Sequence, residues 1–193
     1  MKIILASNNF KKAQEMKACL PVSFNLLTAA DFNIESPDET GTTFVENAII
    51  KARYSSQISG LPAIADDSGL EVDYLLGQPG IYSSRYAGDA ATDADNNQKL
   101  LIALNGIVER TARFRCVIVY LRHALDPMPI IASGTWEGEI LQEPDGDGGF
   151  GYDPLFFVPD LGSSVATLSA ADKRLFSHRG KALQEFNRLI NGD

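Results

Sequence analysis

The seven residues from Ile64 to Leu70 constrain the fold of this chain more than any other segment. The run Ile64-Ala65-Asp66-Asp67-Ser68-Gly69-Leu70 is apolar up to Ala65 and then places two adjacent carboxylates before a hydroxyl and a glycine. This order predicts that Asp66 and Asp67 lie on a turn at the carboxyl end of a short buried strand, the edge at which open α/β sheets hold ligands. Two desolvated carboxylates need a cation, and Mg²⁺ is the predicted one because it prefers oxygen ligands. The alternative is that one Asp caps the turn and the other is solvated.

Composition narrows the class of protein. A chain of 193 residues, 45% hydrophobic, predicts one globular domain over residues 1–193. A net charge of -8 argues against a protein that coats nucleic acid, although a nucleotide can still bind through a few local cations. Two widely spaced cysteines, the direct start Met1-Lys2 and the lack of a long apolar run predict a soluble protein of the reducing cytoplasm.

The first half of the chain has the order of an α/β protein. A strand over 2–6 leads through a turn into a helix over 12–20, and a second strand at 24–27 leads into an acidic loop. Thr43-Phe44-Val45-Glu46 predicts a capped helix, and Thr92 predicts the start of another that runs to about Leu104. Residues 77–91 are expected to form a long surface loop.

The second half predicts extended structure followed by one helix. Residues 113–121 alternate, and 129–141 form a second extended run, so the two are expected to pair as an antiparallel hairpin. A glycine-rich turn then leads into an apolar strand at 155–158, and the chain ends with a helix that begins near Ser177.

Three further segments carry candidate ligand contacts. Between the first strand and helix, the residues from Ser7 to Lys12 (Ser7, Asn8, Asn9, Phe10, Lys11 and Lys12) could cradle phosphate, or Asn9 could simply cap the helix. The turn containing Phe150, Gly151, Tyr152 and Asp153 could place an aromatic ring against a flat ligand, or bury that ring in the core. His178 and Arg179 open the last helix with donors expected to point outward, the alternative being a surface histidine and an ion-paired arginine.

Six blocks occur in order along the chain. They are Ser7-Asn8-Asn9-x-x-Lys12, Glu39-Thr40-Gly41-x-Thr43-Phe44-x-Glu46-Asn47-Ala48, Ala65-Asp66-Asp67-Ser68-Gly69-Leu70, Pro79-Gly80-Ile81-Tyr82-Ser83-Ser84-Arg85, Gly148-Gly149-Phe150-Gly151-Tyr152-Asp153-Pro154 and Ser177-His178-Arg179-Gly180. Together they resemble the inosine triphosphate pyrophosphatase (Ham1-like) family. The resemblance implies a mixed α/β sheet flanked by helices, with two lobes around an active-site groove.

The resemblance also implies an activity and a set of roles. The activity is Mg²⁺-dependent hydrolysis of ITP, dITP and XTP to the monophosphate and pyrophosphate by a protein that is typically a homodimer. Asp67 resembles the general base and metal ligand, Glu39 (or the adjacent Asp38) a second metal carboxylate, and Asp66 the partner that orients Asp67.

Other residues resemble the substrate-binding set. Lys12 and Lys173 would hold the triphosphate, Ser68 would touch the phosphate or ribose, and Phe150 would stack on the purine beside Gly151, Tyr152 and Asp153. His178 and Arg179 would donate to the 6-oxo group, which adenine lacks. Two alternatives stay open: a related Maf-type pyrophosphatase for other nucleotides, and a nucleotide sensor without turnover.

Overall fold

The computed structural model describes residues 1–7, 9–21 and 23–192, and the side chains of Phe10 and Lys11 lie outside the description. Its chain forms two compact units. Unit 1 comprises Met1–Asp67, Cys116–Gly134 and His178–Asp193, and unit 2 comprises Ser68–Arg115 and Thr135–Ser177. Three strands contribute residues to both units, namely β3 (Ala63–Val72), β4 (Thr111–Leu121) and β5 (Ile130–Ile140).

The strands form one mixed sheet with the order β2-β1-β3-β4-β5-β6-β7. In unit 1, β1 (Lys2–Leu5) lies parallel to both β2 (Asn25–Thr28) and β3. In unit 2, β6 (Phe156–Val158) pairs antiparallel with β5 and with β7 (Ser163–Ser164). This mixed α/β sheet flanked by helices confirms the predicted fold class, and β4 and β5 are neighbours as the predicted hairpin requires.

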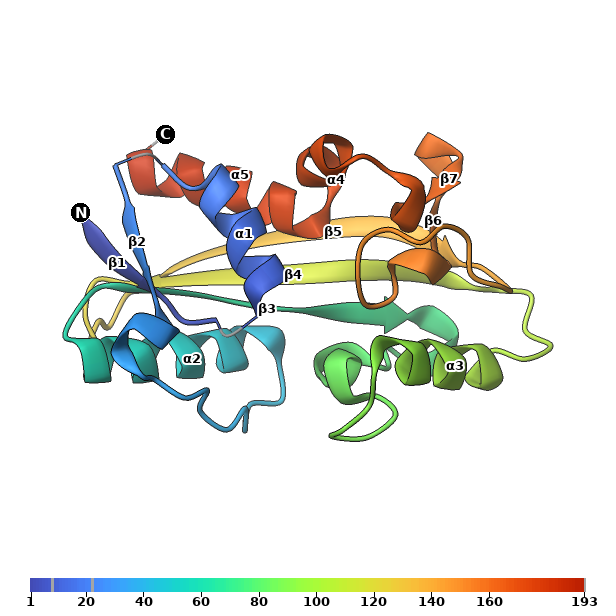
Figure 1. Cartoon of the computed structure of the whole chain (residues 1–193), viewed down its shortest axis with the longest axis horizontal. Helices are drawn as coiled ribbons and strands as arrows, with labels where there is room; N and C mark the ends of the chain where they lie inside the picture. Colours follow the sequence, from blue (N-terminus) through green and yellow to red (C-terminus); the bar gives the residue numbers. More distant parts are fainter. Residues whose placement is uncertain (8, 22, 193) are drawn as a thin grey trace. The chain divides into compact units, whose positions relative to one another are not determined.

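The helices of unit 1 cover both faces of its strands. Helices α1 (Phe10–Cys19) and α5 (His178–Asn191) lie on one face, and α2 (Phe44–Ser59) lies on the other (Figure 1). Each face has its own apolar core, with Ile64 packed on the α1 and α5 side and Ala63 and Ala65 on the α2 side. Successive residues of β3 therefore point to opposite faces, as a strand requires.

The helix starts follow from local capping. Asn9 caps α1 by accepting a hydrogen bond from the Lys12 amide, and Thr43 and Thr92 cap α2 and α3 (Asp93–Ala103) within capping boxes. The helix starts at Thr43 and Thr92 confirm the sequence prediction, whereas α1 begins at Phe10, two residues before the predicted start, with Asn9 in the capping role given as the alternative. Capping of this kind satisfies amide groups that would otherwise lack a partner at a helix end.

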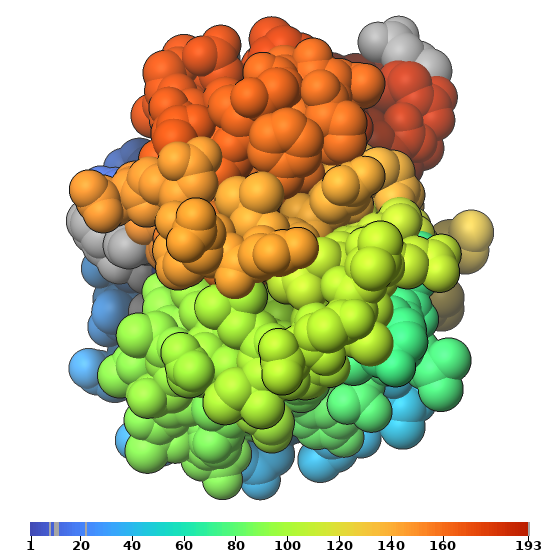
Figure 2. All heavy atoms as spheres, turned by 90° about the vertical axis from the view of Figure 1, so that its right-hand side faces the viewer, coloured from blue at the N-terminus to red at the C-terminus, as the bar shows by residue number. Residues whose placement is uncertain are grey.

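Unit 2 contains α3, α4 (Ala170–Phe176) and a third apolar core that includes Leu70, Trp136 and Phe156. Its residues around 90–110 and 140–165 reach the surface on the face that Figure 2 shows. The chain also has short 3-10 helices at Ala29–Phe32, Asp73–Leu75, Gly80–Arg85, Asp153–Leu155, Pro159–Leu161 and Val165–Thr167.

Two sequence predictions need correction in unit 2. Residues 77–91 are not one unstructured loop, because Gly80–Arg85 is a 3-10 helix in which the Ser83 hydroxyl donates to the Gly80 carbonyl and accepts from the Leu70 amide. Helix α4 is absent from the sequence prediction, which has only one helix near the end of the chain. It is only seven residues long, and its local signals are brief: the N-cap Ser169, Asp172 in the first turn, and Lys173 and Arg174 in the last turn.

Candidate functional site

Asp66 and Asp67 lie inside strand β3, which continues to Val72. The predicted turn at this point is therefore wrong, and so is the alternative in which one Asp caps that turn. Ser68 and Gly69 continue the extended backbone. Because side chains alternate along a strand, the two carboxylates point to opposite faces, Asp66 toward α1 and α5 and Asp67 toward α2. Both are buried, with 2% and 6% of their surfaces exposed.

Asp66 lies in a network with balanced charge. Its Oδ2 accepts hydrogen bonds from Arg179 Nη2 at 3.2 Å and Nε at 3.4 Å, and Lys12 Nζ lies 3.6 Å away. Arg179 Nη1 also donates to Glu15 Oε2 at 2.5 Å. Burial alone would raise the pKa of Asp66, but Lys12 and Arg179 outweigh burial and hold that pKa well below its usual range. Asp66 is therefore a fixed anion.

Asp67 lies in a network with an excess of negative charge. Lys51 Nζ, from α2, donates to Asp67 Oδ1 and to Glu39 Oε1, both at 2.8 Å. One ammonium thus serves two carboxylates. Burial is the main cause that raises the pKa of Asp67, and the nearby Glu39 adds to the effect, against the opposing influence of Lys51. Asp67 is the better proton acceptor of the two neighbouring carboxylates.

The residues around Lys51 fit a divalent cation. Glu39 and Asp67 already converge on one cationic group, and Asp67 Oδ2 is buried with no hydrogen-bond partner among the residues described. Within residues 1–7, 9–21 and 23–192, no group of three or more His, Cys, Asp or Glu side chains is arranged to hold a metal. Two carboxylates with further ligands from substrate phosphates match the way that Mg²⁺ is usually bound, whereas zinc needs more protein ligands.

The loop before α1 is only partly described. Ser7 Oγ accepts a hydrogen bond from the Asn9 amide, and Asn9 caps the helix. Lys12 extends from the first turn of α1 to Asp66. Asn8 and the side chains of Phe10 and Lys11 fall outside the described residues, so the predicted phosphate contacts of these three residues stay predictions. The capping role of Asn9 is confirmed and is compatible with phosphate binding at the same helix start.

Unit 2 holds the predicted aromatic cluster. Lys173 Nζ lies 4.2 Å from the centre of the Phe150 ring and donates to Asp153 Oδ2, which also accepts from the Phe150 amide at 2.8 Å. Gly151 has φ of 62°, and its amide donates to Asp93 Oδ2. Phe150, Asp153 and Lys173 are therefore brought together, with the Phe150 ring only partly buried, and their predicted substrate contacts stay predictions.

Two predicted contacts take other positions. Tyr152 is buried in the core of unit 2, and its hydroxyl donates to the Ser83 carbonyl, so its side chain has a structural role. Arg179 does not point outward as expected. It is 2% exposed and its donors already engage Asp66 and Glu15, so the structure favours the ion-paired alternative. His178 is also buried, at the first position of α5.

Sequence reasoning missed Lys51 and Glu15. Lys51 lies four residues after Asn47 on α2, and Glu15 lies three residues after Lys12 on α1, so each shares a helix face with a residue of a recognised motif. That periodicity could have identified both. Asp93 and Asn97, which bond the Gly151 amide and carbonyl, gave no comparable local signal, because they are far from Gly151 in sequence.

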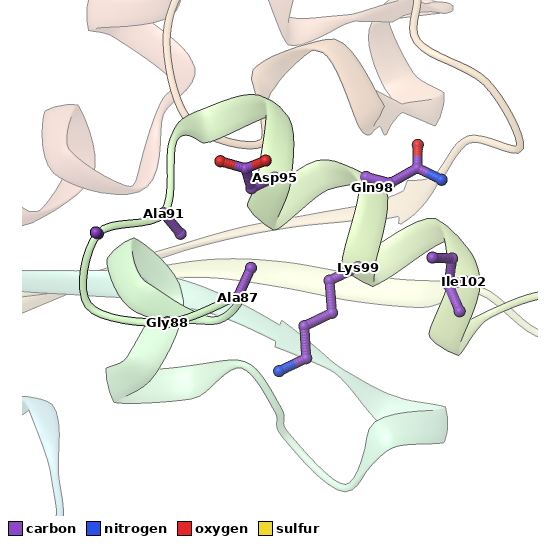
Figure 3. A pocket seen from close by; sticks show the side chains of 8 residues that line it. Ala87, Gly88, Ala91, Asp95, Gln98, Lys99 and Ile102 are labelled. Carbon is purple, nitrogen blue, oxygen red and sulfur yellow. The ribbon is translucent and has the colours of Figure 1, made fainter.

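A separate cavity of about 550 Å³ lies beside α3 (Figure 3). Its charged side chains have structural partners: Asp95 completes the capping box of Thr92, and Lys99 donates to the Tyr86 carbonyl and lies over the Tyr86 ring. The rest of the lining is largely small or apolar. This cavity lacks the carboxylate and cation arrangement that marks β3.

Comparisons with known proteins identify the family of this chain. Residues 3–189 match the Ham1 family. A dITP/XTP pyrophosphatase of Vibrio parahaemolyticus is 56% identical over 95% of this chain and 93% of that protein, and one of Escherichia coli O157:H7 is 51% identical over 95% and 94%. The solved structure of a HAM1 protein from Coxiella burnetii has a TM-score of 0.95 and 45% identity, with 100% of both chains covered. The chain belongs to the Ham1 family.

Proposed function

We propose that this protein hydrolyses nucleoside triphosphates of deaminated purines, such as ITP, dITP and XTP, to the monophosphate and pyrophosphate. One observation carries the proposed chemistry: buried Asp67 has a raised pKa and shares a single cation with Glu39. The purine substrate class is supported by the relatives, which are named dITP/XTP pyrophosphatases.

Asp67 and Glu39 are proposed to hold Mg²⁺. The metal would supply charge neutralisation of the triphosphate and increase the acidity of the attacking water. Lys51 supports this assignment because its ammonium already bridges the two carboxylates. Of the pair Asp66 and Asp67, Asp67 fits a metal ligand better, because its surroundings carry the excess of negative charge.

Asp67 is proposed as the general base. Its free Oδ2 would accept a proton from the water that attacks the α-phosphorus, while the bond from that phosphorus to the pyrophosphate oxygen breaks. Lys12 is proposed to stabilise the negative charge that develops on the leaving pyrophosphate, together with the first amides of α1. Ser7, Asn8, Asn9, Phe10, Lys11 and Ser68 are retained as proposed phosphate or ribose contacts.

Phe150 is proposed to stack on the purine. Its ring is half-buried. Lys173 Nζ lies over the ring, and the Phe150 amide donates a hydrogen bond to Asp153, so the ring is positioned without being enclosed. Phe150→Ala should raise KM about 5- to 150-fold, since a base stack is worth about 1–3 kcal/mol. Turnover at saturating substrate should change much less. A loss of kcat with unchanged KM would assign the ring to the fold instead.

Selectivity for a 6-oxo purine is proposed to involve His178, whereas Arg179 is proposed to act through Asp66 and to affect all substrates alike. The alternative in which Arg179 itself donates to the purine loses support because three of its donors bond to carboxylates. Lys173 is proposed to contact the triphosphate as well as Asp153.

A homodimer in the cytoplasm is the proposed state of the protein. Tyr74, Leu76 and Tyr82 are exposed in or beside the segment 77–91, and this exposed apolar surface supports a contact with a second copy. Light scattering at micromolar concentration tests the dimer.

In the part of the chain that the structure describes, no helix is both long and apolar enough to cross a membrane.

A substrate panel tests the proposed function. Pyrophosphate release from ITP, dITP, XTP, GTP and ATP should be fast for the first three, slow for the last two, and abolished by a chelator. Preference for pyrimidine triphosphates would favour a Maf-type enzyme. Tight ITP binding without pyrophosphate release would instead indicate a nucleotide sensor.

A further inference from the structure

Asn47 connects helix α2 to the acidic loop that carries Glu39. Its side chain is fully buried, and Oδ1 accepts a hydrogen bond from the Gly41 amide at 2.9 Å. A Cβ atom on Gly41 would lie 2.6 Å from Glu46 Cβ and 2.7 Å from Asn47 Oδ1, so only glycine allows the loop to approach this closely. Glu39, two residues before Gly41, is thereby held against α2.

The same helix presents the cation that Glu39 meets. Lys51 lies one helical turn after Asn47, and its Nζ joins Glu39 to Asp67. Glu46 fixes the next part of the loop by accepting hydrogen bonds from the amides and hydroxyls of Thr42 and Thr43. Helix α2 therefore sets the position of the loop on one side and contributes the bridging ammonium on the other.

Helix α3 provides a natural comparison. It begins with the same arrangement, a capping box formed by a Thr and an acidic residue, followed directly by a buried Asn. In α3 this residue is Asn96, and its Oδ1 accepts a hydrogen bond from the Ala87 amide in the preceding loop. Asn96 also donates to the Ser84 carbonyl. Asn47 differs, because its buried Nδ2 has no hydrogen-bond partner in the described parts of the chain. A buried donor of this kind weakens the fold, so stability alone does not account for asparagine at position 47.

We propose that Asn47 and Gly41 form a latch that positions Glu39 for the metal, which makes Asn47 a positioning residue for metal affinity. This proposal rests on the proposed metal site at Asp67 and Glu39. Without the latch, the loop keeps its hydrogen bonds to Glu46 but loses the one that fixes the segment next to Glu39. Partners that orient metal ligands typically contribute about 10–100-fold to metal affinity.

Binding of Mn²⁺ to the full-length protein without nucleotide tests the latch by calorimetry. Asn47→Ala should weaken Mn²⁺ binding about 10–100-fold. Asn96→Ala, the matched control, should bind Mn²⁺ as the unmodified protein does. Because Asn47→Ala also removes the unpaired donor, its unfolding midpoint in urea should change less than that of Asn96→Ala. If Asn47 has a purely structural role, Asn47→Ala should instead lower the urea unfolding midpoint and leave Mn²⁺ affinity unchanged.

Two further variants separate the latch from the metal site itself. Gly41→Ala disturbs the same contact from the loop side and should weaken Mn²⁺ binding in the same direction, which also covers the case in which Asn47→Ala fails to fold. Glu39→Gln tests the metal site directly. If Glu39→Gln weakens binding and the two latch variants do not, the latch is wrong. If Glu39→Gln leaves Mn²⁺ affinity unchanged, the proposed metal site is wrong and the latch falls with it.

Discussion

The two faces of strand β3 place neighbouring carboxylates in opposite electrostatic surroundings. On the face of α1 and α5, Asp66 and Glu15 meet two cations, Lys12 and Arg179. On the face of α2, Asp67 and Glu39 share one cation, Lys51. The first face is balanced, whereas the second carries one net negative charge.

This difference in charge gives Asp66 and Asp67 different roles. Asp66 has its pKa held low by its cations and stays ionised, which suits a structural anion that fixes Lys12 and Arg179. Asp67 has its pKa raised by burial, which suits a proton acceptor. Environments that push two neighbouring pKa values apart identify acid and base roles in enzymes. The missing positive charge on the α2 face is what a divalent cation would provide.

The largest effect is expected on the balanced face. Arg179→Met removes the cation but keeps an apolar side chain of similar length, and it leaves buried Asp66 with Lys12 in ion-pair range and a weaker influence from Lys51. Loss of one partner of a buried ion pair typically costs about 3–5 kcal/mol. Urea unfolding of the variant should show a loss of this size, and Asp66→Asn in the same background should recover part of it.

Substrate selectivity of Arg179→Met provides the second readout. If Arg179 acts through Asp66, kcat/KM for ITP and for ATP should fall by the same factor. If Arg179 instead donates to the purine, the ITP/ATP ratio should shrink, because ATP never made that contact. A stability loss below about 1 kcal/mol would mean that the buried pair contributes little.

The next effect concerns turnover on the unbalanced face. Asp67→Asn keeps the size of the side chain but removes the proton acceptor and one metal ligand. Turnover of ITP should fall about 10²-fold or more, equivalent to about 2.7 kcal/mol, because that is the usual contribution of a general base. Pyrophosphate release by the folded variant is the measurement. Turnover near that of the unmodified protein would transfer the role to another carboxylate, and Glu39→Gln would then be the next variant to measure.

Much of this arrangement could be predicted from sequence, because local signals encode it. Thr43, Thr92 and Asn9 mark helix starts through capping, and the alternation before Leu121 marks a strand. The pair Asp66 and Asp67 stands out in the sequence because two adjacent carboxylates follow an apolar run. Its setting differs from the prediction, since a Ser-Gly pair usually favours a turn, whereas here a ten-residue strand continues through it.

Long-range pairing could not be predicted in the same way. Arg179 is 113 residues from Asp66, and its partner depends on how α5 packs on the strands of unit 1. A buried ion pair overrides the surface position expected for a helix N-terminus. Lys51 was missed because an isolated lysine on a helix is usually solvated. Its spacing from Asn47 places it on the same helix face, but its contacts with Glu39 and Asp67 depend on the fold.

A smaller effect is expected in the pH dependence of stability without metal. The folded pKa of Asp67 is raised from the ordinary value of 3.8, so ionisation of Asp67 disfavours the folded state. Asp67→Asn should therefore match the unmodified protein below the unfolded pKa. As pH rises toward the folded pKa of Asp67, the variant should become more stable than the unmodified protein. Above that pKa, the difference in their free energies of unfolding should stay constant. A tenfold change in the acid dissociation constant on folding corresponds to about 1.4 kcal/mol of stability.

The opposite sign is expected for Asp66. Its folded pKa is lowered, so its charge stabilises the fold above the unfolded pKa, and that contribution is lost as pH falls toward the folded value. Asp66→Asn should thus be less stable than the unmodified protein at neutral pH. Urea unfolding of both variants from about pH 3 to about pH 8, with a chelator present, compares the two faces directly. Curves of the same sign would contradict the contrast between them.

The smallest effect separates the outer carboxylates, Glu15 and Glu39. Glu15→Gln keeps an oxygen that can accept from Arg179 Nη1 and removes only the charge, and the Glu15 side chain is 24% exposed, so stability should fall by less than about 1 kcal/mol. Salt should reduce this loss, because about 1 M salt shortens the Debye length to about 3 Å. Glu39→Gln removes one of two carboxylates that compete for a single ammonium, so its stability should hold or rise while Mn²⁺ binding weakens. Calorimetry and urea unfolding of the two variants side by side provide the measurement. If Glu39→Gln destabilised the protein as Glu15→Gln does, the two faces would be equally balanced, and the case for a missing cation beside Asp67 would fail.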